Sequence, residues 1–124
     1  MKLLLDTHAA LWWLADDRRL SAEAVRHLTD PHNRALLSAT VVWEVAIKRS
    51  LGKLDAPEAF AQTLLDAGAV ALPVTLAHAE GVEALPWHHR DPFDRMLVAQ
   101  ARTEGAVLLS GDDALHAYDV PIVW

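Results

Sequence analysis

The stretch LLLDTHAALWWLA, residues 3–15, joins a short apolar run, one aspartate and a helical pattern in direct succession. Three consecutive leucines at 3–5 predict a strand buried on both faces, because a half-exposed strand alternates apolar with polar residues. Residues 8–15 predict the helix that follows. A buried strand that leads straight into a helix is typical of an α/β protein with a parallel sheet.

The same alternation recurs along the chain. Strand-like segments are expected at 34–38, 69–74, 106–110 and 120–124, and helices at 21–30, 40–51, 57–67, 75–85, 92–101 and 113–118. Strands separated by helices at this spacing indicate a parallel sheet covered on both faces. With no repeat, linker or low-complexity segment in between, we expect one α/β sandwich domain over residues 1–124.

Composition limits the class of protein. Of 124 residues, 52% are hydrophobic and 23% charged, as in an ordinary globular chain. There is no cysteine, and no apolar run approaches the length of a membrane span. We therefore expect a soluble cytoplasmic protein that does not contact a membrane. The net charge of −6 argues against a passive nucleic-acid-coating protein, but it is compatible with a metal-dependent enzyme that cuts nucleic acid.

Two aspartates open the helical stretch RDPFDRMLVAQA, residues 90–101. Asp91 lies where an N-cap belongs, directly before Pro92 at the first helical position. Asp94 shares its helix face with the apolar residues at +3, +4 and +7, namely Leu97, Val98 and Ala101. An ionised carboxylate on an inward face is unfavourable without a partner. We expect Asp91 to cap the helix and Asp94 to serve another purpose.

Other acids follow the predicted strands. In open parallel sheets, ligands bind beyond the carboxyl ends of the strands. Asp6 ends the first strand, although it could equally cap the helix after it. Glu44 lies one turn into the third predicted helix and could simply pair with Lys48 four residues later. Asp112 follows the fourth strand, but either it or its neighbour Asp113 must cap the short helix that comes next.

Each acid alone has a structural explanation, but all four emerge at one edge of the predicted sheet. Four clustered carboxylates repel one another unless a cation lies among them. Mg²⁺, or alternatively Mn²⁺, suits such an all-oxygen cluster. A bound metal activates water at neutral pH and stabilises charge on phosphate oxygens. The pattern therefore predicts phosphodiester hydrolysis.

Four segments in order, LLLDTH (3–8), SATVVWEVAIKRSLGKL (38–54), HHRDPFDRMLVAQA (88–101) and LLSGDDAL (108–115), resemble the PIN-domain ribonucleases. They look most like the VapC toxins of bacterial type II toxin–antitoxin systems. The resemblance covers nearly the whole chain. It implies a three-layer α/β/α sandwich whose five-stranded parallel sheet has the order 3-2-1-4-5, which makes strands one and four neighbours.

The resemblance also implies functional roles. Asp6, Glu44, Asp94 and Asp112 match the acidic quartet of the family. Asp6 and Asp94 are then the metal ligands, while Glu44 and Asp112 act directly or through water, and Ser110 supports the site. The implied protein is a Mg²⁺-dependent endoribonuclease with an RNA substrate. Its implied partners are a second copy of the chain and a small antitoxin whose tail lies in a groove near the site.

Several side chains keep more than one interpretation. His88 and His89 are more typical of a polar loop than of contacts to RNA phosphates or a metal. Lys48, Arg49 and Lys53 could contact RNA, or could simply complement the dipole at a helix carboxyl end. Large aromatic residues are usually core, although one tryptophan could serve a subunit or antitoxin contact; the helical ones are Trp12, Trp13 and Trp43.

Two rival classes remain. A receiver domain or haloacid-dehalogenase-like phosphatase would use aspartyl-phosphate chemistry. A receiver needs paired acids after strand one and a late lysine, but Asp6 stands alone and Lys53 is the last lysine. The phosphatase needs an aspartate where this chain has His8. The second rival is a non-catalytic PIN-fold domain that only binds a partner, which an incomplete quartet would favour.

Overall fold

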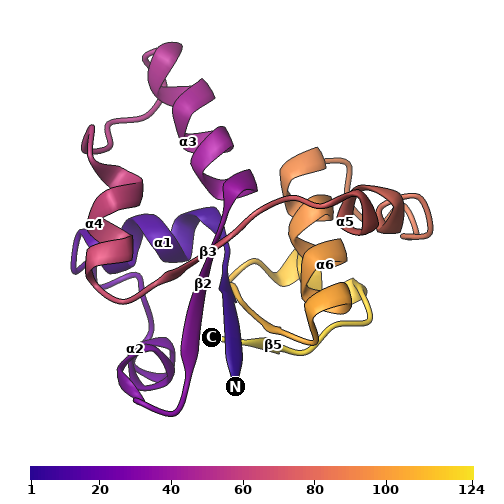
Figure 1. The fold of residues 1–124 in the computed structure, drawn as a ribbon, viewed down its shortest axis with the longest axis horizontal. Helices are drawn as coiled ribbons and strands as arrows, with labels where there is room; N and C mark the ends of the chain where they lie inside the picture. Colours follow the sequence, from indigo (N-terminus) through magenta and orange to yellow (C-terminus); the bar gives the residue numbers. More distant parts are fainter.

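The protein is described by a computed structural model of residues 1–124, which contains a five-stranded, all-parallel sheet (Figure 1). The strands are β1 (Lys2–Leu5), β2 (Arg34–Ser38), β3 (Val70–Leu72), β4 (Val107–Leu109) and β5 (Ile122–Val123). Their order is β3-β2-β1-β4-β5, and every neighbouring pair is parallel. The predicted fold class and strand order are confirmed.

The sheet forms around β1, which pairs with β2 on one side and β4 on the other. Leu3, Leu4 and Leu5 are fully buried, as expected for a central strand covered on both faces. Leu108 and Leu109 of the neighbouring strand are equally buried. The continuous apolar runs noted in the sequence are therefore the central strands of the sheet.

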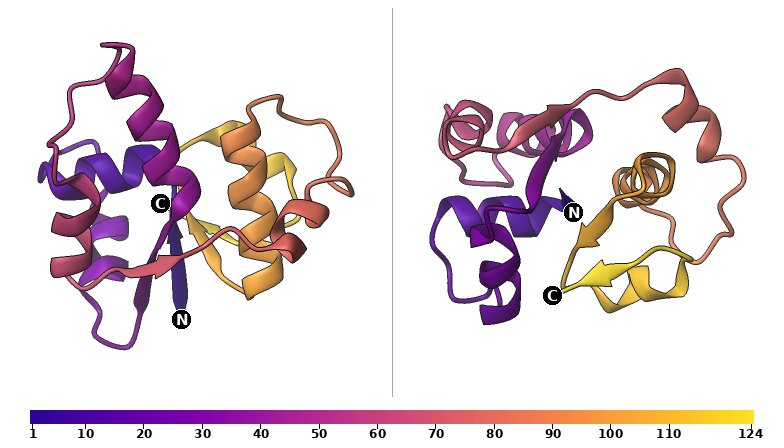
Figure 2. Two further views of the ribbon diagram at one scale, coloured as in Figure 1. Left: turned by 45° about the horizontal axis from the view of Figure 1, so that its top comes forward. Right: turned by 60° about the horizontal axis from the view of Figure 1, so that its bottom comes forward.

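Six α-helices and one 3₁₀-helix connect the strands: α1 (Thr7–Leu14), α2 (Ala22–Thr29), α3 (Ala39–Ser50), α4 (Phe60–Asp66), α5 (Leu76–Gly81), α6 (Pro92–Glu104) and η1 (Asp113–Ala117). Helices α1, α2 and α4 lie on one side of the sheet and α5 and α6 on the other (Figure 2). Helix α3 follows β2 directly and contacts α1 and α6, one helix from each layer. None of the helices has the length and hydrophobicity needed to cross a bilayer.

The structure corrects several predicted helix boundaries, including the end of α6, which lies at Glu104 and not at residue 101. Helix α4 begins at Phe60 and not at Pro57, because residues 57–59 form a turn and Ala59 provides no side-chain cap. Helix α5 ends at Gly81, and the residues after it continue as turns. The segment after Asp112 is a 3₁₀-helix, whose tighter winding is common in such short pieces.

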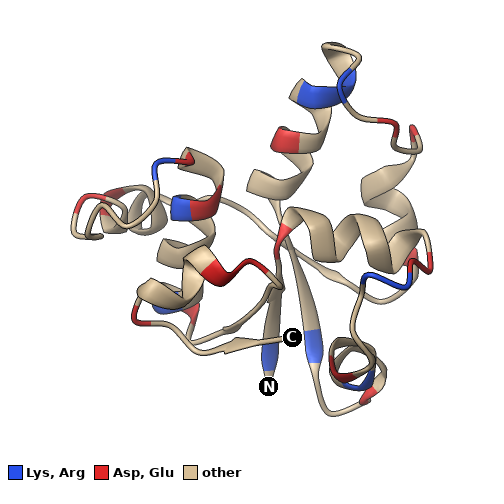
Figure 3. Cartoon of the chain, turned by 180° about the vertical axis from the view of Figure 1, so that it is seen from behind, with Lys and Arg blue, Asp and Glu red and all other residues tan.

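The register of β1 and β4 determines which residues meet at the carboxyl edge. Leu5 pairs with Leu109, and the Asp6 N–H donates to the Leu109 carbonyl over 3.2 Å. Asp6 and Ser110 therefore leave the sheet at the same level on adjacent strands. Acidic positions lie on several of the segments around this edge, whereas the basic positions of α3 lie at its far end (Figure 3).

The tryptophans are less buried than expected. Trp12 and Trp13 are partly buried and pack against the core. Trp43 is 61% exposed, with its ring edge-on to Phe93 at a centroid distance of 5.0 Å. The expectation that Trp43 belongs to the core is wrong, because its ring packs on Phe93 at the surface and borders an open cavity next to α6.

Candidate metal centre

The first turn of α6 contains two aspartates, of which Asp91 caps the helix and Asp94 does not. The Asp91 carboxylate accepts the backbone N–H groups of Phe93 over 2.8 Å and of Asp94 over 3.2 Å, so Asp91 is the N-cap, as predicted. The Asp94 side chain is 21% exposed and accepts no backbone hydrogen bond. The Asp94 carboxylate is therefore available for another role.

Asp94 lies in an environment that disfavours its charge. Burial raises the pKa of Asp94 to about 7, and the negative charges of Asp91, Glu44 and Asp6 add to the shift, while His89 opposes it. Because Glu44 and Asp6 lie on α3 and at the end of β1, three separate parts of the chain direct acidic groups towards Asp94. This is the electrostatic signature expected of a site that holds a cation.

Asp6 caps the helix that follows it and also lies near the other acids. One of its oxygens accepts the Ala9 N–H over 2.7 Å, so Asp6 is the N-cap of α1. The side chain is buried, and this burial raises its pKa; hydrogen bonds with Ser110 and Ala9 and the charge of His8 oppose the shift, and Asp112 adds to it. Asp6 thus lies in the same electrostatic field as Asp112 while it caps a helix.

Glu44 is buried in α3, and each of its carboxylate oxygens accepts one hydrogen bond. One carboxylate oxygen accepts the Thr7 hydroxyl over 2.6 Å, and the other accepts the Lys48 ammonium over 2.5 Å. This bond raises the pKa of Lys48, and the charges of Asp91 and Asp94 raise it further. The expected Glu44–Lys48 pair therefore exists, and it lies close enough to the acids of α6 to feel their charge.

Asp112 takes both roles that the sequence divided between Asp112 and Asp113. Its Oδ1 accepts the Ala114 N–H over 3.0 Å and caps η1. Its Oδ2 lies 3.8 Å from the His89 ring nitrogen Nε2. Asp113 is exposed in the first turn of η1. Asp112 is thus the member of the pair that lies in the acidic cluster.

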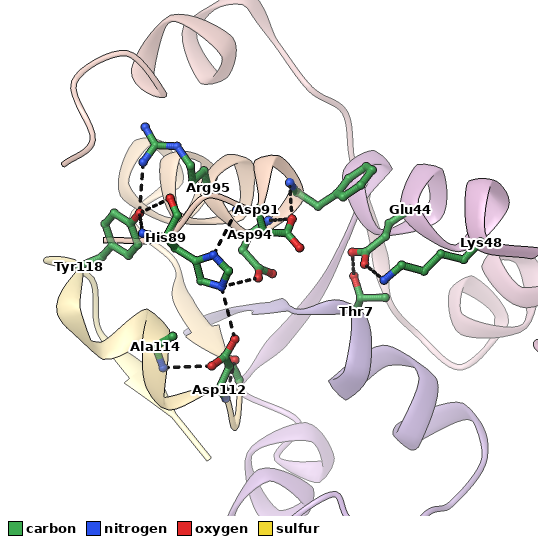
Figure 4. Close-up of polar contacts among 12 residues, drawn as sticks. Thr7, Glu44, Lys48, His89, Asp91, Asp94, Arg95, Asp112, Ala114 and Tyr118 are labelled. Carbon is green, nitrogen blue, oxygen red and sulfur yellow. Dashed lines mark hydrogen bonds and ion pairs between the residues drawn. The ribbon is translucent and has the colours of Figure 1, made fainter. Parts of the chain in front are cut away.

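His89 lies in the cluster, although the sequence favoured a polar loop for it over a contact with a metal or with RNA phosphates. Its Nε2 lies 3.2 Å from Asp94 Oδ2, and the candidate ligand atoms of His89, Asp94 and Asp112 all lie within 4.8 Å of one another (Figure 4). His88 lies outside this group, with its ring edge-on to Tyr118. Beyond the adjacent histidine pair, the one local clue to His89 was its position two residues before the capping Asp91.

The donor set at this edge fits a hard divalent cation. Asp94 and Asp112 are brought together directly, whereas Asp6 and Glu44 lie outside the closest group and contribute through their charge. Ser110 is buried and donates towards Asp6, and its oxygen accepts the Asp112 N–H over 3.1 Å. Carboxylate oxygens without thiolates are the ligands that Mg²⁺ and Mn²⁺ prefer.

A family model described as the PIN domain matches residues 3–121. The chain belongs to the PIN domain family. In this PIN domain, the predicted acids lie on β1, α3, α6 and the segment after β4, at one edge of the sheet. A comparison with curated proteins gave no match.

Solved structures share the fold of this PIN domain over almost its whole length. VapBC2 from Rickettsia felis, bound to a DNA fragment from its promoter, matches with a TM-score of 0.74 and 13% identity, covering 99% of this chain and 98% of the other. VapBC-1 from nontypeable Haemophilus influenzae matches with a TM-score of 0.68 and 19% identity, covering 99% and 97%. DNA-bound VapBC from Salmonella typhimurium matches with a TM-score of 0.69 and 14% identity, also covering 99% and 97%. At these identities the likeness establishes the fold.

Proposed function

We propose that this PIN domain is a metal-dependent endoribonuclease and the toxin of a type II toxin–antitoxin pair. The observation that carries the proposal is the carboxylate of Asp94, which Asp91 frees from capping and which lies in the field of Glu44 and Asp6. The matching solved structures are VapBC complexes, and this supports the assignment to a toxin–antitoxin pair.

Asp6 and Asp94 are the proposed metal ligands, with Mg²⁺ as the expected ion and Mn²⁺ as the alternative. Glu44 already accepts two hydrogen bonds, which favours a contact through water over direct ligation. Asp112 has one oxygen committed to the cap of η1 and one that faces the cluster. A divalent cation held here supplies an activated water and charge stabilisation at a phosphodiester.

The protein's own residues prepare the site for that chemistry. The N-cap bonds fix Asp6 and Asp112 at the ends of adjacent strands, so neither carboxylate has to be ordered when substrate binds. Lys48 pairs with Glu44 and partly offsets its charge, so that the carboxylate is held in one position beside the aspartates.

The proposed partners are RNA, a cognate small antitoxin and a second copy of the chain. Trp43 and Trp87 are exposed, and both line an apolar cavity of about 490 Å³ between α3, α5 and α6. Exposed aromatic residues around a cavity are typical of a protein contact surface. Size-exclusion chromatography with light scattering, with and without the co-expressed product of the neighbouring gene, tests the two protein partners, the antitoxin and the second copy of the chain.

The deciding experiment is cleavage of total bacterial RNA by the purified protein with Mg²⁺ or Mn²⁺, with excess EDTA, and with Asp6→Asn and Asp94→Asn in parallel. Asp113→Asn is the matched control, because Asp113 is next to Asp112 in the chain but is not one of the residues whose ligand atoms gather in the cluster. Discrete fragments from the wild type and the control, lost with EDTA and in both variants, are the expected result. Intact RNA with either metal would contradict the assignment and favour a non-catalytic partner-binding domain.

The aspartyl-phosphate alternatives are weakened by the fold. Receiver domains have the flavodoxin-like strand order 2-1-3-4-5, whereas this sheet has the order 3-2-1-4-5. In addition, His8 occupies the place of the second aspartate that the phosphatase reaction needs. No observation on this chain favours either alternative over the nuclease.

A further inference from the structure

We infer that His89 is a positioning residue of the acidic site, which directs a protonated Nε2 at Asp94, with Asp112 farther away, and does not ligate the metal. The inference deepens the proposed function and rests on it for its effect on metal binding. The donor role itself follows from contacts within the chain.

The ring of His89 is held in one tautomer. Its Nδ1 accepts the backbone N–H of Asp91 over 3.1 Å. A ring nitrogen that accepts a hydrogen bond carries no proton, so in the neutral ring the proton is on Nε2. Nε2 faces the Oδ2 atoms of Asp94 and Asp112 at 3.2 and 3.8 Å. A protonated Nε2 has no lone pair to offer a cation. It is directed instead at the carboxylate of Asp94, while Asp112 lies beyond hydrogen-bond distance and interacts through its charge.

The backbone of His89 is held from the other side by Tyr118. The His89 N–H donates to the Tyr118 hydroxyl over 3.0 Å, and that hydroxyl is directed at the His89 carbonyl at 3.4 Å (Figure 4). The same hydroxyl accepts a hydrogen bond from Arg95 Nη1 over 3.2 Å. With two bonds accepted and one donated, the tyrosine hydroxyl is fully used, and its position is fixed.

Arg95 anchors this arrangement in the interior. Its side chain is buried at 3% exposure, and it donates to backbone carbonyls of the loop before His89, those of Val82, Leu85 and Pro86. Its guanidinium also lies 3.8 Å from the centre of the Trp87 ring. No acidic side chain pairs with Arg95, so this buried cation is used to hold the loop that presents His89.

His89 therefore connects the two elements that carry the closest acids. Asp94 belongs to α6 and Asp112 to the start of η1, and the imidazole N–H lies between their carboxylates. Metal-ligating carboxylates are commonly held in this way by an outer hydrogen-bond donor. The rival arrangement, with His89 as a ligand, requires the proton to move to Nδ1. The Nδ1–H and the Asp91 N–H would then be two donors that face each other, and the hydrogen bond between them would be lost.

The test is a two-bond ¹H–¹⁵N NMR spectrum of protein labelled at histidine, recorded with EDTA and again with saturating Mg²⁺. The resonance that is lost in His89→Gln is assigned to His89, and the one that is lost in His88→Ala is assigned to His88. We expect His89 to be protonated at Nε2 in both spectra. A proton on Nδ1 with EDTA, or a deprotonated, metal-shifted Nε2 with Mg²⁺, would overturn the inference.

Manganese affinity, measured by titration calorimetry, tests the consequence. His89→Ala is expected to weaken Mn²⁺ binding at least about tenfold, as is usual for the loss of an outer-shell partner. His89→Gln restores most of the affinity because its amide N–H can donate, and Tyr118→Phe has an intermediate effect. His88→Ala is the matched control and leaves the affinity unchanged. Unchanged affinity in His89→Ala contradicts the positioning role.

The two proposals fail in different ways. If Mn²⁺ and Mg²⁺ do not bind the wild type at all, the proposed metal centre is wrong, while the tautomer seen with EDTA still decides the donor role. If metal binds but the His89 proton lies on Nδ1, the metal centre stands and the positioning role is wrong.

Discussion

Asp91 accepts the N–H of Asp94, and this one hydrogen bond gives two neighbouring aspartates opposite roles. Asp91 accepts the free N–H groups in the first turn of α6, so the carboxylate of Asp94 is not needed as a cap and lies at the carboxyl edge of the sheet. Burial and three other acids then raise the pKa of Asp94 to about 7. The predictions below follow from this division of roles.

Asp94→Asn is expected to abolish RNA cleavage and to raise the stability of the EDTA-treated protein at pH 8 by about 1 kcal/mol. This gain is smaller than the free energy that corresponds to the whole pKa shift, because the carboxyl is partly solvated and its charge is screened. Urea denaturation measures the stability. Asp91→Ala is the contrasting variant, since loss of the cap costs about 1 kcal/mol. A strongly destabilised Asp94→Asn would show that the carboxylate is structural.

The pH dependence of stability follows from the same group. The pKa of Asp94 is raised on folding, so its contribution is fully present below about pH 4 and is lost as the pH rises to about 7. Across this window the unfolded chain releases a proton that the folded chain keeps. The free energy of unfolding of the wild type should therefore fall relative to Asp94→Asn from pH 4 to 7. Parallel curves for the two proteins would refute the raised pKa.

Divalent metal is expected to stabilise the fold in a pH-dependent way. A ligand that binds only the folded state adds about 2.7 kcal/mol at a hundred times its dissociation constant. Because protons compete for Asp94, the rise in melting temperature with Mn²⁺ should be larger at pH 8 than at pH 5.5. Asp94→Asn should lose most of this rise, whereas Asp113→Asn should keep it. Equal shifts at both pH values would argue for metal binding elsewhere.

Gly111 and Gly81 form a matched pair for a packing test. A Cβ atom at Gly111 would lie 2.6 Å from Cε2 of Trp124, whereas one at Gly81 meets only ordinary contacts at 3.7 Å and beyond. Gly111→Ala must displace Trp124, at a cost of about 1–3 kcal/mol, with a change in tryptophan fluorescence. Gly81→Ala should be neutral or slightly stabilising. A Gly111→Ala protein with unchanged fluorescence and stability would contradict the close packing of Trp124.

The order of elements was predictable because the local signals were strong and consistent. The leucine run before Asp6, the cap and proline before Phe93, and the glycine after Ser110 each mark a boundary through local chemistry. Those signals were sufficient to place four acids at one edge of a parallel sheet. The resemblance to a known family then supplied the strand order, which no local signal contains.

The histidine in the cluster was not predictable for a physical reason. The direction of the His89 ring depends on Tyr118, nearly thirty residues later, and on Arg95 in the next helix. Such tertiary contacts leave no periodic pattern in the sequence. The same holds for Trp43, whose exposure depends on how α3 sits above the edge of the sheet. The double use of the Asp112 carboxylate was likewise invisible, since a cap and a site residue look alike in sequence.

The pairing of Leu5 with Leu109 also has a consequence during synthesis. A growing chain exposes Asp6 and Glu44 early, but Asp112 joins them only when β4 has emerged from the ribosome and added to β1. Pairing over such a separation comes late in folding, because the intervening loop must be closed first. The complete set of acids therefore comes together only after β4 has paired with β1.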